Sequence, residues 1–153
     1  MLHPLQIAEA CQNGADGVLG CIASVLGKGA PLVSGYAASL GIYVPIEVVN
    51  LQETTEAVMA GVPNVSLNVD VGLTLKIPGM MGDMAESLIL ELPADTISMV
   101  GVDSQEALQA AYLAGADVIL CKHEYISEAG AEEVVRAAKE LFEKKNKTKP
   151  SDD

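Results

Sequence analysis

Glu47 is the residue whose type and setting most suggest chemistry. It is the single carboxylate in residues 41–50, GIYVPIEVVN, a short apolar stretch rich in β-branched side chains. A carboxylate buried in such a stretch without a partner costs several kcal/mol or shifts its own pKa upward. We therefore expect Glu47 either to pair with another group or to lie at a strand end facing a cavity. The second arrangement is the one that would give this carboxylate a function.

A second group of polar residues, Lys122, His123 and Glu124, directly follows the apolar residues 118–121. Adjacent residues point their side chains apart, and the other histidine of the chain, His3, stands at the opposite end of the sequence. Neither a metal site nor a His–Glu catalytic pair is therefore expected, and the sequence predicts no cofactor. The GKG at residues 27–29 lacks the spacing of a phosphate-binding loop, so it predicts a turn.

Three cysteines, Cys11, Cys21 and Cys121, are an odd number and lack CxxC spacing. They are expected to be buried, reduced thiols of an intracellular protein. Every apolar run is interrupted before it reaches the roughly 20 residues that span a bilayer, so no membrane span is predicted.

The charges are distributed unevenly along the chain. The net charge is −12, and residues 1–130 carry fifteen acidic side chains against three basic ones, whereas residues 131–153 carry six of each. An anionic body excludes a nucleic-acid footprint, which needs clustered lysine and arginine, but it can dock a basic partner. The mean hydropathy of +0.31 is high for so small and acidic a protein and favours an apolar surface that a partner covers.

Hydrophobic periodicity predicts a repeated strand and helix pattern that positions these residues. Strands are expected near residues 17–22, 42–48, 64–69, 96–100 and 118–121, and residues 72–82 are expected to form a loop. Helices are expected near residues 4–13, 31–40, 53–60, 83–92, 103–113 and 131–145. Repeated βα units predict an α/β fold with parallel strands and right-handed crossovers. An open doubly wound sheet and part of a βα barrel both fit this pattern.

Five short segments occur in an order that a known family shares. They are ADGVLGCIASVL at 15–26, GIYVPIEVVN at 41–50, VSLNVDVGL at 65–73, ISMVGVDSQEAL at 97–108 and AGADVILCK at 114–122. In this order they resemble strands four to eight of indole-3-glycerol phosphate synthase, a TIM barrel of tryptophan biosynthesis. The resemblance implies a partial (β/α) barrel of about five βα units with strands in sequential order. It would form one domain over residues 1–144, followed by a solvated tail at 145–153.

The resemblance also implies site residues. Glu47 aligns with the fifth-strand glutamate that acts as a catalytic acid/base, and Asn68 aligns with a sixth-strand asparagine that contacts substrate. Gly101 is retained at a phosphate-binding position, and Lys122 follows the eighth strand, where it would bind phosphate or else extend along the surface. Glu47 and Asn68 also have simpler interpretations, as partners in local hydrogen bonds.

Other positions depart from the family. Asp70 stands where an arginine is usual, Met99 and Val100 replace a glutamate and a serine, and Cys121 replaces a glycine. No position corresponds to the two catalytic lysines of the earlier strands. The family's ring closure needs a general acid, a base and cations, and loss of one such group typically removes about 10²–10⁴ in rate.

Three functional hypotheses follow. The first is a catalytically impaired barrel segment that acts as a structural or partner-binding subunit. The second is an active synthase, or a related phosphosugar lyase, completed by missing N-terminal strands, another chain or a second copy. The third is a small open α/β binding domain. Under the first two, a partner chain covers the open barrel edges, a phosphorylated small molecule is the expected ligand, and the compartment is cytoplasm or plastid stroma.

Overall fold

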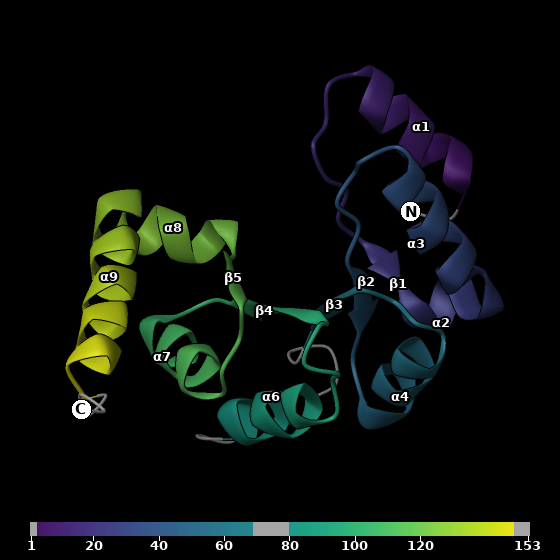
Figure 1. Ribbon diagram of the computed structural model, residues 1–153. Coiled ribbons are helices and arrows are strands. Elements are labelled where there is room, and N and C mark those ends of the chain that lie inside the picture. The colour runs from purple at the N-terminus through teal and green to yellow at the C-terminus, as the bar shows by residue number, and fades with distance from the viewer. Residues whose placement is uncertain (1–2, 69–79, 149–153) are drawn as a thin grey trace, which may run out of the picture.

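The computed structural model of the chain describes residues 3–68 and 80–148. Within these ranges five parallel strands form one sheet in the order β1-β2-β3-β4-β5, which is also their order in the sequence. In Figure 1 they form a row across the centre of the molecule. The strands are β1 (Cys21–Ile22), β2 (Ile46–Val48), β3 (Asn64–Leu67), β4 (Ile97–Val102) and β5 (Val118–Cys121).

Helices occupy the connections between the strands and both ends of the described chain, and Figure 1 shows α4, α6 and α7 together along one side of the strand row. The helices are α1 (Pro4–Gln12), α2 (Ala23–Leu26), the short 3₁₀ helix η1 (Gly27–Gly29), α3 (Ala30–Ser39), α4 (Leu51–Met59), α6 (Met80–Leu90), α7 (Gln105–Leu113), α8 (His123–Ala129) and α9 (Ala131–Thr148).

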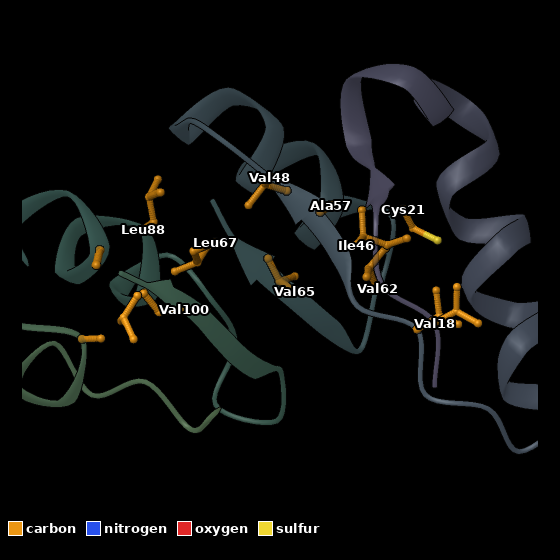
Figure 2. Close-up of a cluster of buried hydrophobic side chains, with 14 of the residues drawn as sticks. Val18, Cys21, Ile46, Val48, Ala57, Val62, Val65, Leu67, Leu88 and Val100 are labelled. Atoms are coloured by element: carbon orange, nitrogen blue, oxygen red, sulfur yellow. The ribbon is translucent and has the colours of Figure 1, made fainter. Parts of the chain in front are cut away.

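The strand order distinguishes a barrel segment from a doubly wound sheet. Right-handed crossovers between strands in sequential order place every crossover helix on the same face of the sheet. We call this helix-covered face the outer face. On β1 to β4 its apolar side chains are almost completely shielded from solvent, and Figure 2 shows them packed with residues of the helices, such as Ala57 and Leu88. They include Cys21, Ile46, Val48, Val65, Leu67, Val100 and Val102.

The opposite face, which we call the inner face, is less covered. Alternation along the strands places Ile22, Val118 and Leu120 on it, with 37%, 36% and 38% of their surfaces exposed. A doubly wound sheet would bury both faces under helices. The predicted α/β fold of about five βα units with parallel strands in sequential order is confirmed, and the barrel alternative fits this arrangement.

Several element boundaries differ from the sequence prediction. The strand predicted at 17–22 is reduced to β1 and one bridge between Gly17 and Tyr43, because Gly20 has a φ of +79° and interrupts the extended run. The next apolar residues form α2, since apolar character alone does not separate a strand from a helical turn. Helix α6 begins at Met80, inside the predicted loop, and the rest of that loop lies outside the described residues.

Helical structure was also not predicted at two places after β5. Helix α8 follows β5 directly, where the prediction had no element between residues 122 and 130. Helix α9 continues to Thr148, so residues 145–148 of the predicted tail are helical, consistent with the glutamate and lysine content of this segment. The last five residues of the tail lie outside the described part.

Burial of Cys21 should make the stability of the fold depend on alkaline pH. Burial raises the pKa of the Cys21 thiol, and the negative charge of Glu47 adds to the rise. An unfolded thiol ionises near pH 8.5, whereas the folded thiol holds its proton to higher pH. The stabilisation is therefore complete below about pH 8.5 and is lost as the pH rises through the raised pKa.

We expect urea denaturation between pH 7.5 and 9.5 to show a free energy of unfolding that falls with pH. The Cys21→Ala variant should be less stable at pH 7.5 because it leaves a cavity, but its stability should fall less steeply with pH. Equal slopes in the two proteins would contradict the assignment to Cys21.

Candidate functional site

The residues of interest lie on the inner face, in rows set by the strand register. One row crosses all five strands and places Glu47 beside Ile22 of β1 and Ser66 of β3, with Met99 and Val118 further along. Met99 is buried, unlike Ile22 and Val118 at the ends of this row. Glu47 is half-buried, so its carboxylate lies in a partly apolar row and not in the helix-packed core.

Glu47 is paired with the residue that the resemblance had placed beside substrate. The side-chain amide Nδ2 of Asn68 donates a hydrogen bond to Oε1 of Glu47 at 2.7 Å. The main-chain N–H of Asn68 donates to the carbonyl oxygen of Val48 at 2.9 Å, which extends the β2–β3 pairing by one step. Both side chains thus stand at the carboxyl ends of neighbouring strands. Glu47 was expected either to pair with another group or to face a cavity. It has a hydrogen-bonded partner, and it also lies on the less covered inner face.

The turn between β2 and α4 is held by two hydrogen bonds. Oδ1 of Asn50 accepts a hydrogen bond from the N–H of Glu53 at 2.9 Å and so caps the N-terminus of α4. The carboxylate of Glu53 returns to accept a bond from the N–H of Val49 at 3.0 Å. These two bonds satisfy backbone donors at the start of the helix. They also fix the backbone at Val49, two residues after Glu47.

Removing this cap should have a measurable cost. We expect Asn50→Ala to lower the free energy of unfolding by about 1 kcal/mol, because the donor at the start of α4 loses its acceptor. Asn50→Asp retains the acceptor and should keep most of the stability, so it is the matched control in urea denaturation. An equal loss in both variants would show that the cap bond is not the cause.

Gly101 and Lys122 lie on the same face, nearer the carboxyl ends of the strands. Gly101 pairs with Leu120, and a methyl group added at Gly101 would meet no atom within 4 Å. Lys122 is half-buried, and its N–H donates to the carbonyl oxygen of Val102 at 2.8 Å. The fold therefore places the four predicted site residues on one face and toward one end of the sheet. The contact between Glu47 and Asn68 is direct, and the phosphate-binding roles of Gly101 and Lys122 stay predictions.

The neighbouring residue His123 has a contact within its own helix. His123 begins α8, and its ring lies 3.4 Å from the hydroxyl oxygen of Ser127, one turn further along the same helix. Among the described residues no group of three or more His, Cys, Asp or Glu side chains could hold a metal ion. Asp70, which stands where the family has an arginine, lies outside the described residues.

Sequence reasoning missed a polar contact at the opposite end of the sheet. The N–H and hydroxyl of Ser98 both donate to Oδ2 of Asp117 at 2.8 Å, and the N–H of Asp117 donates to the Ser98 hydroxyl at 3.1 Å. The apolar neighbours of Ser98 in the sequence hid its role. This contact joins the starts of β4 and β5, at the opposite end of the strands from Glu47 and Asn68, and its hydrogen bonds contribute to the stability of the sheet.

Comparison with solved structures identifies the architecture. A structure described as native KDPGal, a TIM barrel, superposes with a TM-score of 0.68 over 94% of this chain and 68% of its own, at 17% identity. The described strands and helices match part of an aldolase-type TIM barrel. A cube-shaped, highly porous protein cage designed by fusing symmetric oligomeric domains gives a TM-score of 0.71 over 96% of this chain and 53% of its own, at 16% identity.

Comparison with known sequences finds a weak similarity to an enzyme. The indole-3-glycerol phosphate synthase of Micrococcus luteus is 30% identical over 135 residues, which cover 86% of this chain. The chain spans about half the length of this curated relative, since the match covers 49% of it. No family model matches the chain. In the described part of this TIM-barrel segment, no helix is both long and apolar enough to cross a membrane.

Proposed function

We propose that this chain is a segment of an indole-3-glycerol-phosphate-synthase-like barrel, is catalytically impaired by itself, and acts as a structural or partner-binding subunit. The hydrogen bond of 2.7 Å between Asn68 and Glu47 carries the proposal. It joins the two residues that align with the family's acid/base glutamate and substrate-contacting asparagine, at the end of the strands where TIM barrels hold their sites. The weak similarity to the Micrococcus luteus synthase supports the same assignment.

The chemistry available to this pair is limited. Ring closure by the synthase needs a proton donor for the departing hydroxyl, a base, and cations that hold the phosphate and carboxylate. Glu47 can exchange one proton, and Asn68 can orient its carboxylate or donate to a substrate oxygen. Lys122 is a cation that directly follows the carboxyl end of β5. A phosphate is therefore the part of a substrate that this chain is best equipped to hold.

Several catalytic groups of the family have no counterpart here. Since each such group contributes about 10²–10⁴ in rate, the lack of two lysines should leave a rate at least about 10⁴-fold below that of a complete synthase. The described chain also leaves two strand edges, β1 and β5, each with one neighbouring strand. These open edges and the exposed apolar side chains beside them support the proposed role in binding another polypeptide.

A turnover assay tests this proposal. Purified chain incubated with 1-(2-carboxyphenylamino)-1-deoxyribulose 5-phosphate should form no indole-3-glycerol phosphate above the no-protein control. Product that forms with the wild-type chain and disappears with Glu47→Gln would overturn the proposal and favour the alternative of an active lyase. Product that persists in Glu47→Gln would be assigned to a contaminating enzyme. That enzyme would be removed by further purification before the comparison is repeated.

A further inference from the structure

Asn13 stands in a sequence that favours loss of its side-chain amide. It is followed by Gly14, and both residues are exposed to solvent at the end of α1. Glycine has no Cβ, so its main-chain nitrogen can approach the preceding side chain more freely than that of any other residue. Every other asparagine of the chain is followed by a larger residue; these are Asn50, Asn64, Asn68 and Asn146.

The reaction open to this pair proceeds through a five-membered ring. The main-chain nitrogen of Gly14 loses its proton and attacks Cγ of Asn13, the bond from Cγ to Nδ2 breaks, and the amide nitrogen leaves as ammonia. Water then opens the resulting succinimide. Opening at Cγ gives aspartate, whereas opening at the main-chain carbonyl gives isoaspartate, in which the chain continues through the side chain. The net reaction is hydrolysis of one amide by water.

The folded helix end holds the nucleophile of this reaction in a hydrogen bond. The N–H of Gly14 donates to the carbonyl oxygen of Cys11 at 2.9 Å, and the N–H of Ala15 donates to that of Ala10 at 3.0 Å. Gly14 has a φ of +83°. This conformation and these two bonds are the Schellman motif that ends many helices.

The leaving group is also held. Nδ2 of Asn13 donates to the carbonyl oxygen of Glu9 at 2.7 Å, and the N–H of Asn13 donates to the same oxygen at 3.1 Å. A nucleophile attacks only from close contact in the right orientation. Because both reacting groups are hydrogen-bonded to the helix, the ring can close only after the last turn of α1 opens.

Helix α1 is held to the rest of the fold by few groups. It has nine residues, of which Ile7 is buried, and it packs against α3, which lies beside it in Figure 1. At its start, Nδ1 of His3 accepts a hydrogen bond from the N–H of Leu5 at 3.2 Å. A short helix with one buried side chain opens at a lower free energy than the whole domain unfolds.

We infer that Asn13 is a deamidation site that folded α1 protects, so that its conversion records the opening of this helix. The product cannot rebuild the same helix end. Aspartate has no N–H to donate to Glu9, and its negative charge faces the carbonyl oxygens at the end of the helix. Isoaspartate lengthens the main chain ahead of Gly14 and disrupts its bond to Cys11. The modification therefore weakens α1 permanently, and it is independent of the proposed function.

Peptide mapping by mass spectrometry tests the inference. The full chain and a synthetic peptide of residues 9–17 are incubated in the same neutral buffer, and the asparagine, aspartate and isoaspartate forms at position 13 are quantified over time. Conversion should be at least about tenfold slower in the full chain than in the peptide, because only the open fraction reacts. Equal rates, or a peptide that does not convert, would overturn the inference.

A matched pair of variants locates the opening in α1. His3→Ala removes the acceptor at the start of the helix and should raise the conversion rate of Asn13 about fivefold, the change that loss of a typical cap predicts. His3→Ser retains an acceptor and should keep the wild-type rate. Amide exchange on β3 and β4 should be the same in both. Equal conversion in the two variants, or a rise matched by faster exchange on β3 and β4, would contradict local opening.

A second pair of variants measures the effect of the product. Asn13→Asp and Asn13→Ala both lose the donor to Glu9, but only the aspartate adds a negative charge at the end of α1. Amide exchange in α1 should therefore be faster in Asn13→Asp than in Asn13→Ala, and slowest in the wild-type chain. Identical exchange in all three proteins would show that deamidation does not weaken the helix.

Discussion

Leu67→Ala is expected to lower the free energy of unfolding by about 2–5 kcal/mol, enough to unfold a large fraction of a marginally stable domain. Leu67 is completely shielded from solvent on the outer face of β3 and pairs in register with Val48 of β2 and Val100 of β4. Figure 2 shows it among the buried side chains that join these strands to Leu88 of α6. Alanine would leave a cavity where three strands and a helix meet.

Urea denaturation followed by circular dichroism measures this effect. Leu113→Ala is the matched control, because Leu113 is 72% exposed and its truncation should change the free energy of unfolding by about 0.5 kcal/mol or less. A loss below about 1 kcal/mol in Leu67→Ala would show that the outer face of the sheet is not the core of the fold.

Asn68→Asp is expected to destabilise the chain by about 1–3 kcal/mol at neutral pH and much less in mild acid. It replaces the amide that donates to Glu47 at 2.7 Å with a second carboxylate. Two carboxylates at this distance hold one proton between them, so the pKa of the pair rises above the unfolded values of about 4. The stabilisation from the shared proton is complete below those values and is lost as the pH rises through the raised pKa.

The measurement is the difference in free energy of unfolding between variant and wild type at pH 4.5 and pH 7.5. Asn64→Asp is the control, because Asn64 is half-buried at the other end of the same strand and, by alternation, on the same face. Its effect should depend little on pH. A pH-independent loss in Asn68→Asp would mean that Glu47 and Asn68 are not in contact in solution.

The alternation of strands and helices could be predicted from the sequence because each βα unit carries its own signals, whereas the sequential strand order was predicted from the family resemblance. An apolar stretch of four to six residues, a polar cap such as Asn50 or Ser104, and an amphipathic helix recur along the chain, and they act within a few residues of one another. The predicted element boundaries were wrong where the backbone conformation of a single residue determines where a strand begins. Gly20, with its positive φ, shortens β1, and nothing in the composition of residues 15–22 shows which glycine does so.

The arrangement of the candidate site residues could be predicted only in part. The position of Glu47 in an apolar stretch indicated either a partner or a cavity, but the partner is 21 residues away and depends on the β2–β3 register. Asn68 and Gly101 were proposed as site residues through the family resemblance, because an isolated asparagine or glycine has no distinguishing pattern. The Ser98–Asp117 contact was missed for the same reason, since it exists only once β4 and β5 are paired.

The initial rate of the isolated chain, measured beside the complete Micrococcus luteus synthase, tests the central claim most directly. The substrate is 1-(2-carboxyphenylamino)-1-deoxyribulose 5-phosphate, and the assay must detect about one part in 10⁴ of the synthase rate, the deficit expected from the missing catalytic groups. We predict no rate above the no-protein control. A rate above about one part in 10⁴ of the synthase rate that is lost in Glu47→Gln would contradict the proposed function.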